Sequence, residues 1–138
     1  MPNQADPEAG CIPACAIGIL AWKGHAAPTE DALLQAMYGT QAGGSGFDRL
    51  KVALAPSGIL VQVERPRSLA ERITALCSAG HPVMVAVNGG AGAHCVVVES
   101  VSGGDAVVHD PDPGLVNPQT VSLAALAGRA CGDLAFLP

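Results

Sequence analysis

Residues 10–22 read GCIPACAIGILAW, an apolar run with a cysteine near its start and a proline two residues later. Proline is tolerated in the first turn of a helix, because its missing N–H group would have no partner there in any case. The pattern predicts a buried helix from Cys11 to Trp22. At its N-terminus the unpaired N–H groups and the helix dipole favour a thiolate over a thiol. Cys11 is therefore the first candidate nucleophile.

Composition favours one folded domain over residues 1–138. Of the 138 residues, 49% are hydrophobic and 14% charged, and the net charge is −5. Basic residues cluster only at Arg65-Pro66-Arg67, which makes nucleic acid and anionic membranes poor partners. The N-terminus lacks a basic segment, and the apolar run from Cys11 to Trp22 is too short to span a bilayer. We therefore expect a cytoplasmic chain without an export signal or membrane insertion.

Five cysteines are present, and an odd number in a domain of this size argues against a disulfide framework. Zinc is the alternative use of cysteine, but neither a CxxC pair nor an HxxxH pair supports it. We expect no metal and no cofactor. Because cysteine is among the most buried residue types, four of the five are interpreted as small core residues. These four are Cys15, Cys77, Cys95 and Cys131.

The chain divides into a helical first half and a strand-rich second half. After an extended lead-in over residues 1–10, further helices are predicted after the caps Thr29 and Ser68 and over residues 47–55 and 122–128. Strands are predicted over residues 59–64, 83–87, 94–101 and 106–110, near residue 120, and over residues 133–137. Helices followed by an antiparallel sheet define the α+β class.

A predicted hairpin brings a histidine and an aspartate together. The turn is Ser102-Gly103-Gly104-Asp105, and His94 and Asp110 are equally distant from Ser102 along the chain. We expect the two side chains to lie side by side at one end of the sheet. A cysteine peptidase needs a thiolate, an imidazole that moves protons, and a group that orients the imidazole. His94 and Asp110 suit the second and third roles.

Several motifs together resemble a known family. They are the helix start CIPAC at residues 11–15, GHPVMVAVNG at 80–89, AHCVVV at 93–98, and Asp110-Pro111. Over nearly the whole chain they resemble the papain-like, bacteriocin-processing cysteine peptidases that remove double-glycine leader peptides. The resemblance implies a papain-like fold with the active site in a cleft between the helical half and the sheet half. It also implies Cys11 as nucleophile, His94 as general base and Asp110 as orienting carboxylate.

Two positions depart from the family pattern. The family has glycine directly after the nucleophile, where this chain has Ile12. The family's oxyanion-hole glutamine lies about six residues before the cysteine, whereas Gln4 lies seven before it (11 − 4 = 7). Gln4 is the candidate oxyanion residue. The resemblance further implies cleavage of a peptide or protein after small residues such as Gly-Gly, with a transporter or an immunity protein as partner.

Three alternatives remain open at this stage. The first is a toxin or effector protease that is delivered into another cell and inhibited by an immunity protein. The second, motivated by Ile12 and the displaced Gln4, is a degenerate domain that only binds glycine-rich peptides. The third is an acyltransferase that uses the same triad. The remaining histidines are interpreted as structural, and Asp112 is a less well spaced substitute for Asp110.

Overall fold

The computed structural model describes residues 11–39, 46–89, 92–112 and 114–138. Gln4 and the lead-in over residues 1–10 lie outside the described residues. The helices are α1 (Cys11–Trp22), α2 (Glu30–Tyr38), α3 (Gly46–Leu54), a short 3-10 turn (Ala55–Ser57), α4 (Leu69–Ser78) and α5 (Leu123–Gly128). The strands are β1 (Gln62–Glu64), β2 (Val83–Gly89), β3 (Gly92–Ser102), β4 (Asp105–His109), β5 (Gln119–Ser122) and β6 (Ala130–Phe136).

Helix starts follow the capping residues of the sequence. The side-chain oxygens of Thr29, Ser68 and Ser122 each accept a hydrogen bond from an N–H group in the first turn of α2, α4 and α5, respectively. Each such cap stabilises its helix by about 1 kcal/mol. Helix α1 has the predicted bounds.

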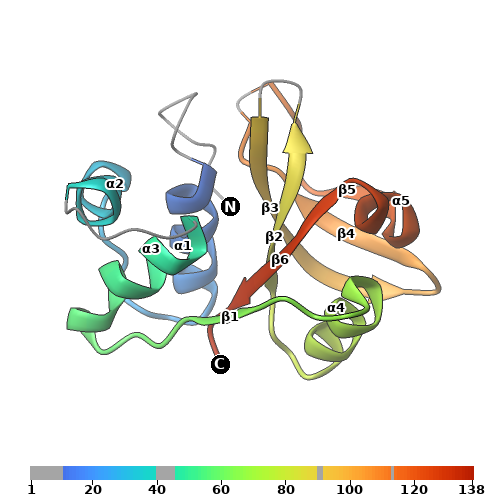
Figure 1. The fold of residues 1–138 in the computed structure, drawn as a ribbon, viewed down its shortest axis with the longest axis horizontal. Coiled ribbons are helices and arrows are strands. Elements are labelled where there is room, and N and C mark those ends of the chain that lie inside the picture. The colour runs from blue at the N-terminus through green and yellow to red at the C-terminus, as the bar shows by residue number, and fades with distance from the viewer. Residues whose placement is uncertain (1–10, 40–45, 90–91, 113) are drawn as a thin grey trace.

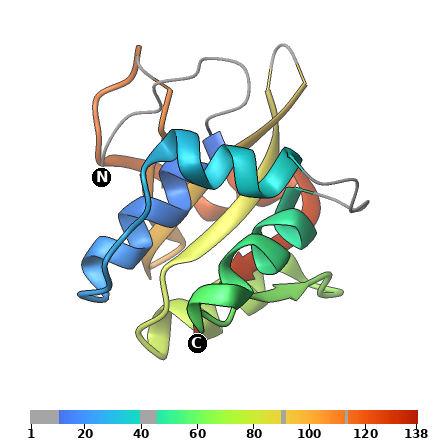
Figure 2. The ribbon, with the colours of Figure 1, turned by 90° about the vertical axis from the view of Figure 1, so that its left-hand side faces the viewer.

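The strands form one antiparallel sheet in the order β1-β6-β2-β3-β4-β5. Figure 1 shows α1, α2 and α3 on one side of this sheet and α4 and α5 on the other. In Figure 2, turned by 90°, the three N-terminal helices stand in front of the sheet. The expected α+β class, with a helical half followed by a sheet half, is confirmed.

The central strands are buried on both faces. Met84 on β2 and Val97 on β3 belong to the core under α1, α2 and α3. Val85, Val96 and Val98 point the opposite way, into a second core under α4 and α5. Side chains alternate between faces along a strand, and both faces are covered here, so residues 83–87 form an uninterrupted apolar run.

Three local predictions differ from the structure. Of the predicted strand 59–64, only Gln62–Glu64 pairs in the sheet. Strands β2 and β3 extend to Gly89 and Gly92, so Asn88, Gly89 and Gly92 of the predicted turn over residues 88–92 belong to the strands, and residues 90–91 lie outside the described residues. Cys131 is exposed rather than buried, because β6 bulges between its pairings with Val87 and Val85.

Within the described residues, no helix combines the length and the apolar composition that crossing a membrane requires.

Candidate active site

Helix α1 holds Cys11 against the sheet. Cys11, the first residue of α1, is half-buried, and the next turn is buried at Pro13, Ala14 and Cys15. Cys15 Sγ donates a hydrogen bond to the backbone oxygen of Cys95, 3.5 Å away on β3. Cys95 directly follows His94, so this contact joins the start of α1 to the part of β3 that carries the histidine.

His94 and Asp110 meet at the end of the sheet, as predicted. His94 Nε2 lies 2.6 Å from Asp110 Oδ1, and the two side chains are 22% and 11% exposed. Their alignment differs from the prediction, however, because Ser102 pairs with Asp105, which centres the turn between Gly103 and Gly104 rather than on Ser102. A bulge between Val98 and Ser100 then shifts the β3–β4 register by one residue and places Asp110 on the same face of the sheet as His94. Continuing this register places Asp110 diagonally across from His94. Diagonal neighbours on one face remain within reach of long side chains.

The charges of the site favour a protonated histidine. The hydrogen bond to Asp110, followed by one to Cys11, raises the pKa of His94 from 6.5 to about 10, against the opposing effect of burial. Because Nε2 of His94 interacts with Asp110, the hydrogen bond with Cys11 falls to the other ring nitrogen, Nδ1. Burial raises the pKa of Asp110, but hydrogen bonds from His94 and from the Asp112 N–H outweigh it, and the net shift is downward.

Asn117 fixes the backbone that carries Asp110. The Asp110 N–H donates to Asn117 Oδ1 at 2.7 Å, and Asn117 Nδ2 donates to the Asp110 carbonyl oxygen at 2.6 Å. The Asp112 N–H adds a bond of 2.9 Å to Asp110 Oδ1. Sequence reasoning missed Asn117, because its partners are backbone atoms. The one sequence feature that could have pointed to it is an asparagine in a proline-rich loop, and asparagine is common in such loops.

Ile12, the residue after Cys11, packs among the helices α1, α2 and α3. It contacts the core under α1, α2 and α3. A Cβ atom added at Gly46, the first residue of α3, would lie only 2.3 Å from Ile12 Cδ1. The space left by a glycine at position 46 therefore accommodates the larger residue at position 12.

The remaining cysteines and histidines considered in the sequence lie in other environments. The pKa of Cys77 is raised to about 11 by burial, and that of the fully buried Cys95 is raised well above its usual value by burial and by Cys15. His81 and His109 pack their rings against Phe136 and Trp22. Among the described residues, no group of three or more His, Cys, Asp or Glu side chains is arranged to hold a metal ion.

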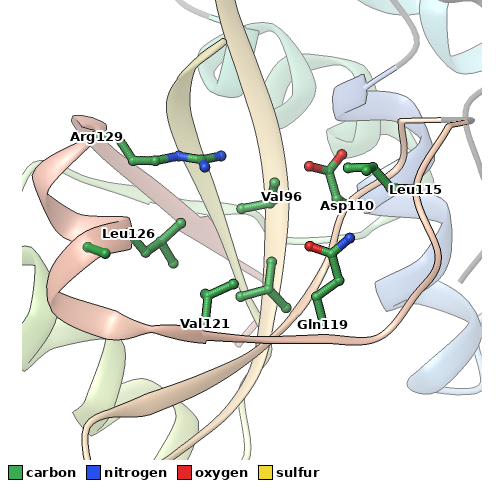
Figure 3. A pocket seen from close by; sticks show the side chains of 9 residues that line it. Val96, Asp110, Leu115, Gln119, Val121, Leu126 and Arg129 are labelled. Carbon is green, nitrogen blue, oxygen red and sulfur yellow. The ribbon is translucent and has the colours of Figure 1, made fainter.

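A cavity of about 300 Å³ borders Asp110 on the side of α5 (Figure 3). Its lining consists of Val96, Val108, Asp110, Leu115, Gln119, Val121, Ala125, Leu126 and Arg129. The charge of Arg129 contributes to the lowered pKa of Asp110. Sequence reasoning missed Arg129, because only the fold brings the end of α5 to the end of β4.

The sequence matches no protein-family model and no curated protein. The fold, in contrast, matches solved structures over its whole length. The peptidase domain of Streptococcus ComA, a bifunctional ABC transporter involved in quorum sensing, aligns with a TM-score of 0.79 and 18% identity, covering 99% of this chain and 96% of that one. At this identity the likeness is one of fold.

Two further structures agree with that likeness. A double-glycine-motif protease from an AMS/PCAT transporter, crystallised with its leader peptide, has a TM-score of 0.72 and 17% identity, covering 99% of this chain and 89% of that one. A C39-like peptidase from Bacillus anthracis has a TM-score of 0.69 and 13% identity, covering 100% and 94%. The chain therefore has the papain-like fold of the double-glycine peptidase domains, as its sequence motifs imply.

Proposed function

We propose that this chain is a cysteine peptidase with Cys11 as nucleophile, His94 as acid and base, and Asp110 as the group that orients His94. One observation carries the proposal: His94 interacts with Asp110 through Nε2 and with Cys11 at the start of α1. A cysteine at a helix N-terminus, beside a protonated imidazole held by a carboxylate, is the arrangement that thiolate chemistry requires.

The reaction is an acyl transfer in two steps. The Cys11 thiolate attacks the peptide carbonyl carbon, and His94 transfers its proton to the leaving amine as the C–N bond breaks. Water, deprotonated by His94, then attacks the thioester carbonyl; the C–S bond breaks, the acid product leaves, and the Cys11 thiolate and protonated His94 are restored. The Cys11 backbone N–H at the helix N-terminus is a donor for the oxyanion, and Gln4 is proposed as the second donor.

The substrate class is proposed from the sequence motifs and the structural neighbours. The protease from the AMS/PCAT transporter is described by its double-glycine motif and was crystallised with a leader peptide. We propose that this chain likewise cleaves a peptide after small residues such as Gly-Gly.

Hydrolysis of a Gly-Gly peptide tests the proposal. Cys11→Ala should lose measurable turnover while the wild type cleaves after the second glycine, with both products identified by mass spectrometry. Cys131→Ala is the matched control, because its side chain is exposed and its Sγ contacts only Asn88 Oδ1, at 3.4 Å, among the described residues. Equal rates for wild type and Cys11→Ala would refute the proposed nucleophile.

A further inference from the structure

The cavity beside Asp110 combines apolar walls with a single cationic side chain. Val96, Val121 and Leu126 are among its lining residues, and Arg129 directs its guanidinium group toward the side where Asp110 lies (Figure 3). Its volume of about 300 Å³ is at the low end of the range for ligand pockets, roughly 300–1,000 Å³. A cavity of this size suits part of a peptide rather than a whole cofactor.

Arg129 is the cation of this cavity, and within the described residues it acts on Asp110 only through its charge, with no ion pair to it. Asp110, the other charged residue of the lining, is bonded to His94 at 2.6 Å, and the protonated imidazole balances its charge. In the part of the chain that the structure describes, Arg65 and Arg72 pair with Asp133 and Glu64, whereas the Arg129 side chain has neither a hydrogen bond nor an ion pair. Its guanidinium donors are therefore available to a ligand.

We propose that this cavity binds an acidic side chain of the peptide substrate, with the carboxylate on Arg129 and the hydrocarbon part against Val121 and Leu126. The planar fork of a guanidinium group matches the two oxygens of a carboxylate. The inference rests on the proposed function, because it assumes a peptide beside Cys11. Since Asp110 forms both a wall of the cavity and part of the triad, an acidic residue seated there would fix the peptide's position relative to Cys11.

A charge scan of Gly-Gly peptides tests this assignment. One position at a time on either side of the Gly-Gly pair carries Glu, Gln or Lys, and kcat/KM is compared within each set of three. At one position we expect the wild type to prefer Glu over Gln by about tenfold, the effect of one hydrogen-bonded charge pair. Arg129→Glu should reverse this preference toward Lys, whereas Arg129→Lys should keep its direction.

Comparing substrates within one variant removes any effect of Arg129 on the triad, because every peptide meets the same Asp110 and His94. Arg67→Glu is the control, since it makes the same charge change at an exposed residue outside the cavity lining. It should leave the preference for Glu unchanged. Circular dichroism confirms that each variant is folded before its preference is compared.

A binding measurement distinguishes the failure of this inference from the failure of the proposed function. Calorimetric titration of the preferred Glu peptide and its Gln counterpart into Cys11→Ala, with and without Arg129→Glu, requires no turnover. Glu-dependent binding that Arg129→Glu abolishes would support the cavity assignment even if hydrolysis does not depend on Cys11. Equal kcat/KM for Glu, Gln and Lys at every position, a wild-type preference for Lys, or a Glu preference that survives Arg129→Glu would each overturn it.

Discussion

At the scale of single residues, the protonation of His94 would control the proposed catalysis. Its pKa is raised from 6.5 to about 10, first by the hydrogen bond to Asp110 and then by Cys11. An imidazolium that persists to high pH keeps a proton ready for the leaving amine. The proposed activity should therefore fall on the alkaline side only as the pH approaches 10.

Replacing Asp110 by Asn removes the larger of these two causes. The pKa of His94 should then fall toward 6.5, and the alkaline limb of the kcat/KM profile should move to lower pH by about 1–3 pH units. At pH 8, kcat/KM should drop on the order of 100-fold, the loss expected when a general acid is absent. Kinetics across the pH range and the NMR titration of the His94 ring measure the two effects separately.

Asp112→Asn is the matched control, since Asp112 Oδ1 accepts a bond from the Gly114 N–H instead of contacting His94. The interaction between His94 and Asp110 also predicts how the stability of the fold depends on pH. Because the pKa of His94 is higher in the folded chain, its contribution is complete below pH 6.5 and is lost as the pH rises through about 10. The difference in melting temperature between the wild type and Asp110→Asn should shrink over that interval. A constant difference would contradict the assignment.

At the scale of elements, the contact between α1 and α3 explains how Ile12 is accommodated. A Cβ atom at Gly46 would lie 2.3 Å from Ile12 Cδ1. Alanine favours a helix over glycine by about 1 kcal/mol in the interior and by less at the first residue, where Gly46 lies, and the contact with Ile12 should cancel that gain in Gly46→Ala. In the Ile12→Ala background the gain should reappear. We expect a coupling free energy of about 1 kcal/mol between the two positions.

Urea denaturation of the wild type, both single variants and the double variant measures this coupling. Effects that add within about 0.3 kcal/mol would show that the two positions do not interact. The single variant Ile12→Ala also tests the candidate site, because Ile12 directly follows Cys11. If Ile12 only fills the space beside Gly46, Ile12→Ala should preserve cleavage of the Gly-Gly peptide.

The elements also show how far sequence reasoning reaches. The hairpin turn at Gly103 and Gly104, both with positive φ, is fixed by local chemistry and could be predicted. The bulge beyond it could not, because it depends on how β3 and β4 fit the rest of the sheet. His94 and Asp110 still meet, because the bulge puts Asp110 on the face of the sheet that carries His94 and their side chains span the remaining diagonal offset.

At the scale of the whole molecule, the fold class could be predicted because the local signals agree with one another. Capping residues, helical runs and apolar strands all indicate helices first and a sheet second. Asn117 and Arg129 could not be found in the same way. Asn117 acts through backbone atoms of Asp110, and Arg129 reaches the site only because the end of α5 and the end of β4 line the same cavity. Both residues therefore come to Asp110 only in the folded molecule.

The helices α1, α2 and α3 share a core with one face of the sheet. We therefore predict that the helices and the sheet unfold together. Ile19 on α1 is completely buried in the core that also holds Met84 and Val97 of the sheet. Ile19→Ala should lower the free energy of unfolding by about 2–5 kcal/mol. Val52→Ala, on α3 with 56% of its surface exposed, is the control and should change that free energy by less than about 0.5 kcal/mol.

Urea denaturation followed by far-UV circular dichroism and by iodoacetamide labelling of Cys11 compares the two halves in one experiment. Because Cys11 is held by the packing of α1 on β3, its labelling should follow the same transition as the loss of secondary structure, in the wild type and in Ile19→Ala. If labelling of Cys11 in Ile19→Ala precedes that transition, α1 detaches while the sheet persists. The geometry of the triad would then depend on a helix that moves independently of its histidine.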